Sequence, residues 1–188
     1  MIYPFMYFDS TWILVLIGII ITGAASLNIK HTYSKYSKVI SRRGLTGADV
    51  AQQIIRVERL PVRIQGIPGN LTDNYDPRNK TINLSDSVRN NPSLAAIGVA
   101  AHECGHAIQD NREYFPLVLR RAMVPVTNIG SMLAMPLILV GVIMSMNQTL
   151  INLGIILFSL AVAFQLITLP VELNASRRAI NILESSQI

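Results

Sequence analysis

One short stretch of the sequence carries the residue types that a metal-dependent hydrolase needs, His102-Glu103-Cys104-Gly105-His106. On a helix, His102 and His106 lie one turn apart on the same face, so both imidazoles can bind one metal ion. The carboxylate of Glu103 lies beside them and can take a proton from water. The spacing therefore predicts a zinc site with two histidine ligands and Glu103 as the general base.

The residues around this motif favour a metal site over the alternative, which is a chance match with two solvated histidines on a surface helix. Apolar residues precede the motif, and Gly105 with Ala107 keeps its surroundings small, so another segment can approach closely. Cys104 is expected to point away from the metal face and to pack. As it is the only cysteine among 188 residues, neither an internal disulfide nor a multi-cysteine zinc finger is possible.

A third metal ligand must come from elsewhere, and Glu172 is the best candidate. The chain has only three histidines, and the third, His31, is the second choice because it lies among basic residues that favour solvent. Glu172 follows a long apolar segment directly, where a carboxylate is not needed for solubility. The alternative interpretation of Glu172 is an ion pair with Arg177 or Arg178, since such surface pairs are common and weak.

Long uncharged segments indicate an integral membrane protein. The run from Thr11 to Leu27 has no charge and approaches the length that crosses a bilayer as a helix. A cleaved signal peptide is the alternative, but no positive residue precedes this run, only Asp9. A second apolar block, Val126–Pro170, is interrupted at Met146–Thr149 and is typical of a transmembrane hairpin. Two buried core helices are the alternative, although soluble helices need a solvated face.

The positions of the charges predict the topology. All sixteen Lys and Arg residues lie within 30–121 or at Arg177 and Arg178. The positive-inside rule then places these parts in the cytoplasm and the N-terminus outside. The hairpin returns to the inner side, so Glu172 can join His102 and His106. The formal net charge of +5 is explained by topology and contact with the lipid bilayer, and nucleic acid is not an expected partner.

The sequence of the cytoplasmic part predicts a small α+β arrangement that is mostly helical. Thr46 and Asp49 form a capping box that starts a helix to about Arg59, and a second helix, from Asn91-Pro92 to about Gln109, carries the metal motif. Between them lie three strand candidates, expected to form a small antiparallel element: Val62–Ile64, Leu71–Tyr75 and Lys80–Leu84. Leu71–Tyr75 or Lys80–Leu84 is expected to line the cleft and to pair with extended substrate.

Four segments are predicted on this basis. An N-terminal transmembrane anchor covers 1–29, and a cytoplasmic zincin-like catalytic segment covers 30–125. A transmembrane hairpin covers 126–170, which makes about three transmembrane helices in all. The C-terminal segment 171–188 supplies the third zinc ligand.

The motifs of this chain resemble those of the neutral zinc metallopeptidases of bacterial membranes (YugP-like). The resemblance extends over nearly the whole chain and is carried by four stretches: 45–48, 71–78, 99–109 and 170–176. It implies zinc peptidase chemistry of a gluzincin-like type, and a similarity to membrane proteases that protect against misfolded membrane proteins. In those proteases a Glu-x-x-Ala-Asp segment supplies the third ligand, which carries over to Glu172 with Ala175 matching. Ser176 stands at the Asp position, and because relatives continue into a further apolar segment, the resemblance implies a shortened form.

The predicted reaction is hydrolysis of a peptide or protein substrate, with Zn²⁺ and Glu103 activating water. Tyr75, Arg177 and Arg178 are candidate donors to the oxyanion. One alternative is an intramembrane site-2-type protease, but the apolar run before His102 is too short to cross a bilayer. The other is a non-catalytic zinc-binding membrane scaffold, which would not need Glu103. The oligomeric state is left open.

Overall fold

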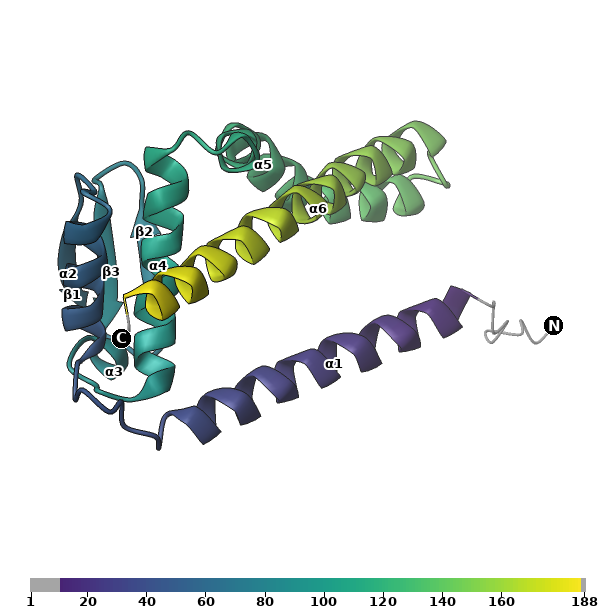
Figure 1. The fold of residues 1–188 in the computed structure, drawn as a ribbon. Coiled ribbons are helices and arrows are strands. Elements are labelled where there is room, and N and C mark those ends of the chain that lie inside the picture. The colour runs from purple at the N-terminus through teal and green to yellow at the C-terminus, as the bar shows by residue number, and fades with distance from the viewer. Residues whose placement is uncertain (1–10, 187–188) are drawn as a thin grey trace.

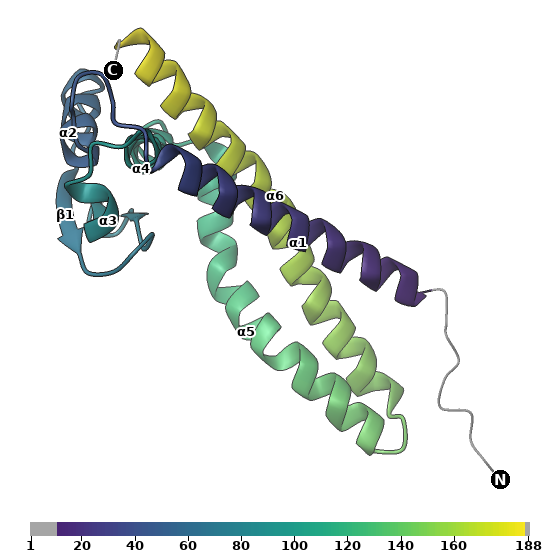
Figure 2. The same ribbon diagram turned by 90° about the horizontal axis from the view of Figure 1, so that it is seen from below.

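The computed structural model describes residues 11–186; residues 187–188 and the first ten, which include Asp9 and belong to the predicted anchor, lie outside the described part. In Figure 1 the short elements pack together at one end, and three long helices extend away from them, an arrangement that Figure 2 shows from below. The helices are α1 (Thr11–Tyr36), α2 (Gly47–Val57), α3 (Asp86–Arg89), α4 (Leu94–Asn111), α5 (Phe115–Ile143) and α6 (Gln148–Ser185). The strands are β1 (Arg63–Ile67), β2 (Asn74–Asp76) and β3 (Thr81–Ser85).

Within residues 11–186, the helices long and apolar enough to cross a membrane are α1, α5 and α6. None of the residues of α1 is buried, and large apolar side chains such as Trp12 and Ile20 are more than half exposed. This much apolar surface is unfavourable in water but is what a lipid-facing helix presents. The prediction of about three membrane helices is therefore supported.

Helices α5 and α6 form the predicted hairpin, joined by a turn next to Asn147. The hairpin is tightly packed through small residues: a Cβ on Gly154 would lie 2.7 Å from the carbonyl oxygen of Ala134. Contacts through small residues are typical of helix pairs in membranes, because they let the two backbones approach closely. Both helices extend beyond the predicted apolar block, since α5 begins at Phe115 and α6 continues through Pro170 to Ser185.

The core lies between α2, α4 and the sheet. The capping box forms as predicted: the Thr46 hydroxyl accepts from the Asp49 N–H at 3.2 Å, and the Asp49 carboxylate accepts from the Thr46 N–H at 2.9 Å. This start orients α2 so that Val50 and Ile54 are fully buried in the core. The last turns of α6 reach the same core through Ala179.

The three strands form a mixed sheet in the order β1-β3-β2, so the prediction of an antiparallel element was wrong in part. β2 pairs with β3 in antiparallel fashion, but β1 runs parallel to β3. The most buried strand, β3, takes the centre, and the short hairpin places β2 on one side of it. β1 must then pair with the other side of β3. The sequence pattern of a single strand does not indicate which strands pair, so this arrangement could not be predicted.

Helix α4 begins at Leu94, two residues later than the predicted start at Pro92. Ser93 is its N-cap and accepts the N–H of Ala96 through its hydroxyl at 3.3 Å. The side chain of Asn91 accepts from the N–H of Ser93 at 2.9 Å. These two bonds satisfy donors at the helix start, so the cap prevails over the preference of proline for a first helical position.

Candidate metal centre

The two histidines of the motif lie on one face of α4, with their ring centroids 4.7 Å apart and the rings edge to face. Cys104 lies on the opposite face, fully buried, with its sulfur 3.9 Å from the carbonyl oxygen of Ala51. The helix thus separates its packing face from the face that carries the imidazoles, as the 3.6-residue period requires.

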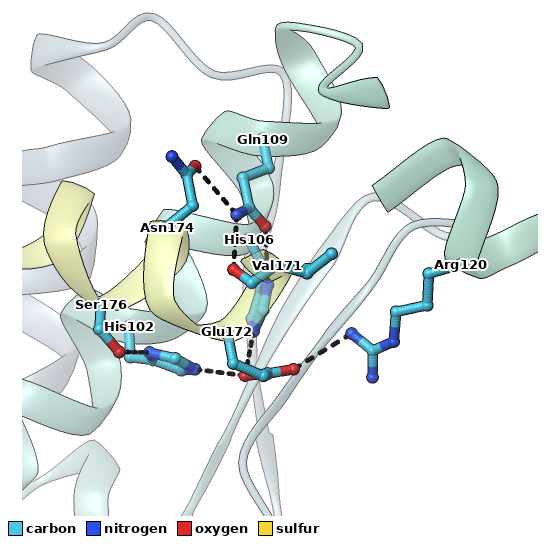
Figure 3. Close-up of polar contacts among 8 residues, drawn as sticks. All are labelled: His102, His106, Gln109, Arg120, Val171, Glu172, Asn174 and Ser176. Atoms are coloured by element: carbon cyan, nitrogen blue, oxygen red, sulfur yellow. Dashed lines mark hydrogen bonds and ion pairs between the residues drawn. The ribbon is translucent and has the colours of Figure 1, made fainter. Parts of the chain in front are cut away.

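Helix α6 crosses α4 beside the motif, and Gly105 permits the close approach. A Cβ on Gly105 would lie 2.5 Å from the carbonyl oxygen of Ala175. At this distance the two backbones touch with no side chain between them. The crossing brings Glu172, which lies less than one turn before Ala175, against the histidine face of α4 (Figure 3).

His102, His106 and Glu172 form a compact group of ligand atoms. The Oε2 atom of Glu172 lies 3.2 Å from Nε2 of His102 and 3.3 Å from Nε2 of His106, and all three atoms lie within 4.8 Å of one another. Ligand atoms about 2.0–2.1 Å from one tetrahedral zinc ion lie about 3.3 Å apart. The donor types and these two separations therefore fit a zinc ion.

The outer nitrogens of both imidazoles also have partners. Nδ1 of His102 lies 3.1 Å from the hydroxyl oxygen of Ser176, and Nδ1 of His106 lies 3.0 Å from Oε1 of Gln109. Contacts of this kind fix ring orientation in metal sites. Ser176, which stands at the Asp position of the related membrane proteases, thus contacts His102.

Gln109 determines the tautomer of His106. The side chain of Gln109 is fully buried, and its Nε2 donates to the carbonyl oxygen of Val171 at 2.8 Å and to Oδ1 of Asn174 at 3.1 Å. With both amide protons used, Oε1 can only accept, so Nδ1 of His106 carries the proton. The lone pair on Nε2 then faces Glu172, as a metal ligand requires.

Arg120 of α5 is a member of the site that the sequence analysis missed. Its Nη1 lies 3.2 Å from Oε1 of Glu172, the carboxylate oxygen that does not face the histidines (Figure 3). This pair leaves Oε2 available to bind a metal ion. In the sequence Arg120 is one of many basic residues. Its contact with Glu172 depends on where α5 packs, which the sequence pattern does not show. Gln109 was missed for a similar reason, since it was assigned only to the end of a helix.

Glu103 faces a pocket of about 350 Å³ beside the three ligand atoms. The pocket wall includes Asp73, directly before β2, Tyr75 of β2 and Arg120 of α5. The side chain of Glu103 is 8% exposed. A carboxylate at the wall of a pocket that also contains the ligand group can reach a water molecule bound there.

The electrostatics of the site reflect its burial. Burial raises the pKa of Glu103, although the nearby His106 and His102 act in the opposite direction. Burial disfavours the charged form of His106, but its hydrogen bond and charge interaction with Glu172 outweigh this and raise its pKa. The protonated form of His106 is thereby stabilised by the same carboxylate that would share a metal with it.

The four other predicted site residues are not members of this group of ligand atoms. His31 lies on α1, is exposed, and is not part of the group of ligand atoms. Tyr75 donates its hydroxyl to Oδ2 of Asp110 at 2.5 Å, and Arg178 donates to Oδ1 of Asn174 at 2.7 Å. Arg177 is exposed. Neither arginine makes the ion pair that was the alternative interpretation of Glu172, which contacts Arg120 instead.

The family of the chain follows from comparison with known proteins. The family model described as "Putative neutral zinc metallopeptidase" matches residues 11–188. The chain belongs to this family. A curated relative, "Putative membrane protease YugP" of Bacillus subtilis (strain 168), is 47% identical over 162 residues, which is 86% of this chain and 72% of that protein. No solved structure matches the chain. The resemblance to this family inferred from the motifs is therefore confirmed.

Proposed function

We propose that the protein is a membrane-anchored zinc metallopeptidase of the gluzincin-like type. His102, His106 and Glu172 would hold the metal. The observation that carries the proposal is that Oε2 of Glu172 lies at zinc-like separations from Nε2 of both histidines, although the two helices are far apart in sequence. Zinc in such a site supplies a Lewis acid that polarises a peptide carbonyl and lowers the pKa of water to about 7.

Glu103 is the proposed general base. It takes the proton of the attacking water and later gives it to the leaving amine, the two transfers that peptide hydrolysis needs. Arg120 is the proposed donor to the oxyanion, because it lines the pocket while the hydroxyl of Tyr75 is held by Asp110. Preorganised donors at such a position stabilise the developing charge.

The proposed substrate is a peptide or protein segment that binds in extended form along β2. β3 is hydrogen-bonded on both sides, so the predicted candidate Lys80–Leu84 cannot accept another strand. β2 is an edge strand, and Asn74 and Tyr75 line the pocket. A substrate added to this edge would place its backbone next to Glu103.

The proposed location is the cell membrane, crossed by α1, α5 and α6, with the N-terminus outside and the active site in the cytoplasm. The charge asymmetry of the sequence supports this sidedness. An active site at the base of membrane helices suits substrates at the bilayer surface, so we include membrane protein quality control in the proposal.

Two observations favour this function over its alternatives. An intramembrane protease needs its metal motif inside a membrane helix, but α4 is not among the helices of residues 11–186 that could cross a bilayer, and it packs against α2 and the sheet. A scaffold would need only the three ligands, whereas this site also presents a buried carboxylate to the pocket.

The proposal is tested by zinc content and hydrolysis of the detergent-purified protein. We expect one zinc per chain, lost in Glu172→Ala but kept in His31→Ala and in Glu184→Ala, a matched control at an exposed position of the same helix. Glu103→Gln should keep zinc and lose about 10²–10⁴-fold in hydrolysis of a fluorogenic peptide mixture. Zinc retained by Glu172→Ala would refute the ligand assignment, and full activity of Glu103→Gln would refute the base.

A further inference from the structure

An open groove of about 830 Å³ adjoins the metal pocket on the side of the membrane anchor. The cytoplasmic end of α1 forms one wall, with Ile29 and Tyr33, and the first half of α4 forms the floor, with Leu94 and Gly98. Asp73, His102 and Glu103 line both the groove and the metal pocket. The groove therefore opens directly onto the reactive face of the site.

The chemistry of the groove changes along its length. At the end shared with the metal pocket it carries the carboxylates of Asp73 and Glu103, and beyond them its described lining is apolar, aromatic or neutral. Leu71 is 50% exposed and Leu94 is 42% exposed there. A charged side chain placed against this lining would lose solvation without gaining a partner, whereas an apolar side chain would remove apolar surface from water.

We propose that this groove is the specificity site of the enzyme and binds a bulky apolar side chain of the peptide substrate next to the cleaved bond. This inference rests on the proposed peptidase function. The groove and the metal pocket share a wall, so a peptide whose cleaved carbonyl lies beside Glu103 would have the side chain of an adjacent residue at the mouth of the groove. The anchor helix α1 thus contributes directly to substrate selection, in addition to holding the protein in the membrane.

Gly98 offers a clean way to fill the groove. A Cβ built on Gly98 would meet nothing within 4 Å, so a larger side chain enters the groove without displacing the backbone. Gly18, also on a helix and also with nothing within 4 Å of a Cβ, is the matched control because it lies in α1 outside the groove. We would compare Gly98→Phe and Gly18→Phe as zinc-loaded full-length proteins in detergent.

The measurement is kcat/KM on two fluorogenic peptides that differ only at the residues flanking the cleaved bond, Phe or Leu in one and Ala in the other. For the wild type and Gly18→Phe we expect preference for the bulky peptide by about 10–200-fold, the range that apolar pockets provide. Gly98→Phe should keep zinc, lose at least about tenfold on the bulky peptide and lose little on the Ala peptide.

Two outcomes would overturn the specificity site while leaving the peptidase intact: equal kcat/KM of the wild type on both peptides, or a Gly98→Phe effect of the same size on both. The second result would be expected if a lipid occupied the groove and only access to the metal were blocked. If zinc-loaded wild type cleaves neither these peptides nor the peptide mixture, the proposed function fails and the specificity site fails with it.

Discussion

At the scale of single residues, Gln109 connects the two helices that build the site. Its oxygen faces Nδ1 of His106, and its nitrogen donates to the carbonyl oxygen of Val171 and to Asn174. One buried side chain therefore orients a ligand on α4 and also holds the α6 backbone next to Glu172. A contact of this kind would act on a bound metal through its ligands and not through substrate.

Replacing Gln109 should weaken zinc binding more than it changes the fold. We expect Gln109→Leu to lower zinc affinity about 10–100-fold, the usual effect of removing an outer partner of a ligand. Competition with a zinc-binding dye measures this. Gln109→Glu, which keeps an acceptor for Nδ1 of His106, should restore part of the affinity, and Gln52→Leu at an exposed position of α2 should not change it. Equal affinity of Gln109→Leu and wild type would show that His106 needs no such partner.

At the scale of elements, the crossing of α4 and α6 brings the three candidate ligands together. The contact between Gly105 and the backbone of Ala175 sets the distance between these helices. A second set of contacts fixes the C-terminal end of α4: Asp110 accepts hydrogen bonds from Tyr75, from Lys80 at 2.6 Å and from Arg121. These bonds join α4 to the sheet and to α5, and so stabilise both walls of the pocket.

Gly105→Ala should push the helices apart. The new methyl would lie 2.5 Å from a backbone oxygen that cannot rotate away. We expect a net destabilisation of up to about 2 kcal/mol, because overpacking costs about 1–3 kcal/mol while Ala gains about 1 kcal/mol of helix propensity. Zinc affinity should fall as well. Gly98→Ala, in the same helix with open space around it, should keep zinc and show no loss in thermal unfolding. A Gly105→Ala protein with wild-type stability and zinc affinity would contradict this view of the crossing.

The folding stability of the protein should depend on pH through Asp110. Burial alone would raise the pKa of Asp110, but hydrogen bonds from Lys80, Tyr75 and Arg121 outweigh it and lower the pKa below its usual value. A lowered folded-state pKa means that this stabilisation is present above about pH 4, the value in the unfolded chain, and is lost as the pH falls through the folded-state pKa.

Asp110→Asn is the corresponding variant. We expect it to be less stable than the wild type at pH 7 by about 1.5–3 kcal/mol, the range for hydrogen bonds to a charged group. The difference should shrink as the pH falls below about 4. Thermal unfolding in detergent between pH 3 and 7 measures this, with the exposed Glu113→Gln as the control. A difference between variant and wild type that does not change with pH would show that the Asp110 charge is not involved.

At the scale of the whole molecule, the three long helices leave the folded part on the same side (Figures 1 and 2). In the proposed topology, the turn between α5 and α6 would lie on the membrane face opposite to the candidate metal centre. All Lys and Arg residues lie within 30–121 or at Arg177 and Arg178, which are the ends of the long helices and the segments between α1 and α5. In the proposed topology these residues would contact anionic headgroups. The arrangement explains how a site can be built from segments before and after a membrane hairpin.

Single-cysteine labelling tests this topology. Gln148→Cys, at the start of α6, should react with a membrane-impermeant maleimide in intact cells, and Lys38→Cys should react only after the cells are opened. The native Cys104 is fully buried, so it should give no signal in the folded protein. Labelling of Lys38→Cys in intact cells would reverse the proposed sidedness.

The sequence alone was sufficient for the features that depend on local patterns. His102 and His106 share a face because the helix period requires it, the capping box starts α2 because two side chains lie three residues apart, and long uncharged segments indicate membrane helices. Glu172 could be proposed because the charge placement predicts that the hairpin returns to the side of the histidines. The tertiary structure alone decided which strands are neighbours, which basic residue meets Glu172, and that Gln109 and Ser176 contact the histidines. These contacts join residues far apart in the chain, and their distances depend on how α4, α5 and α6 pack, which no local pattern encodes.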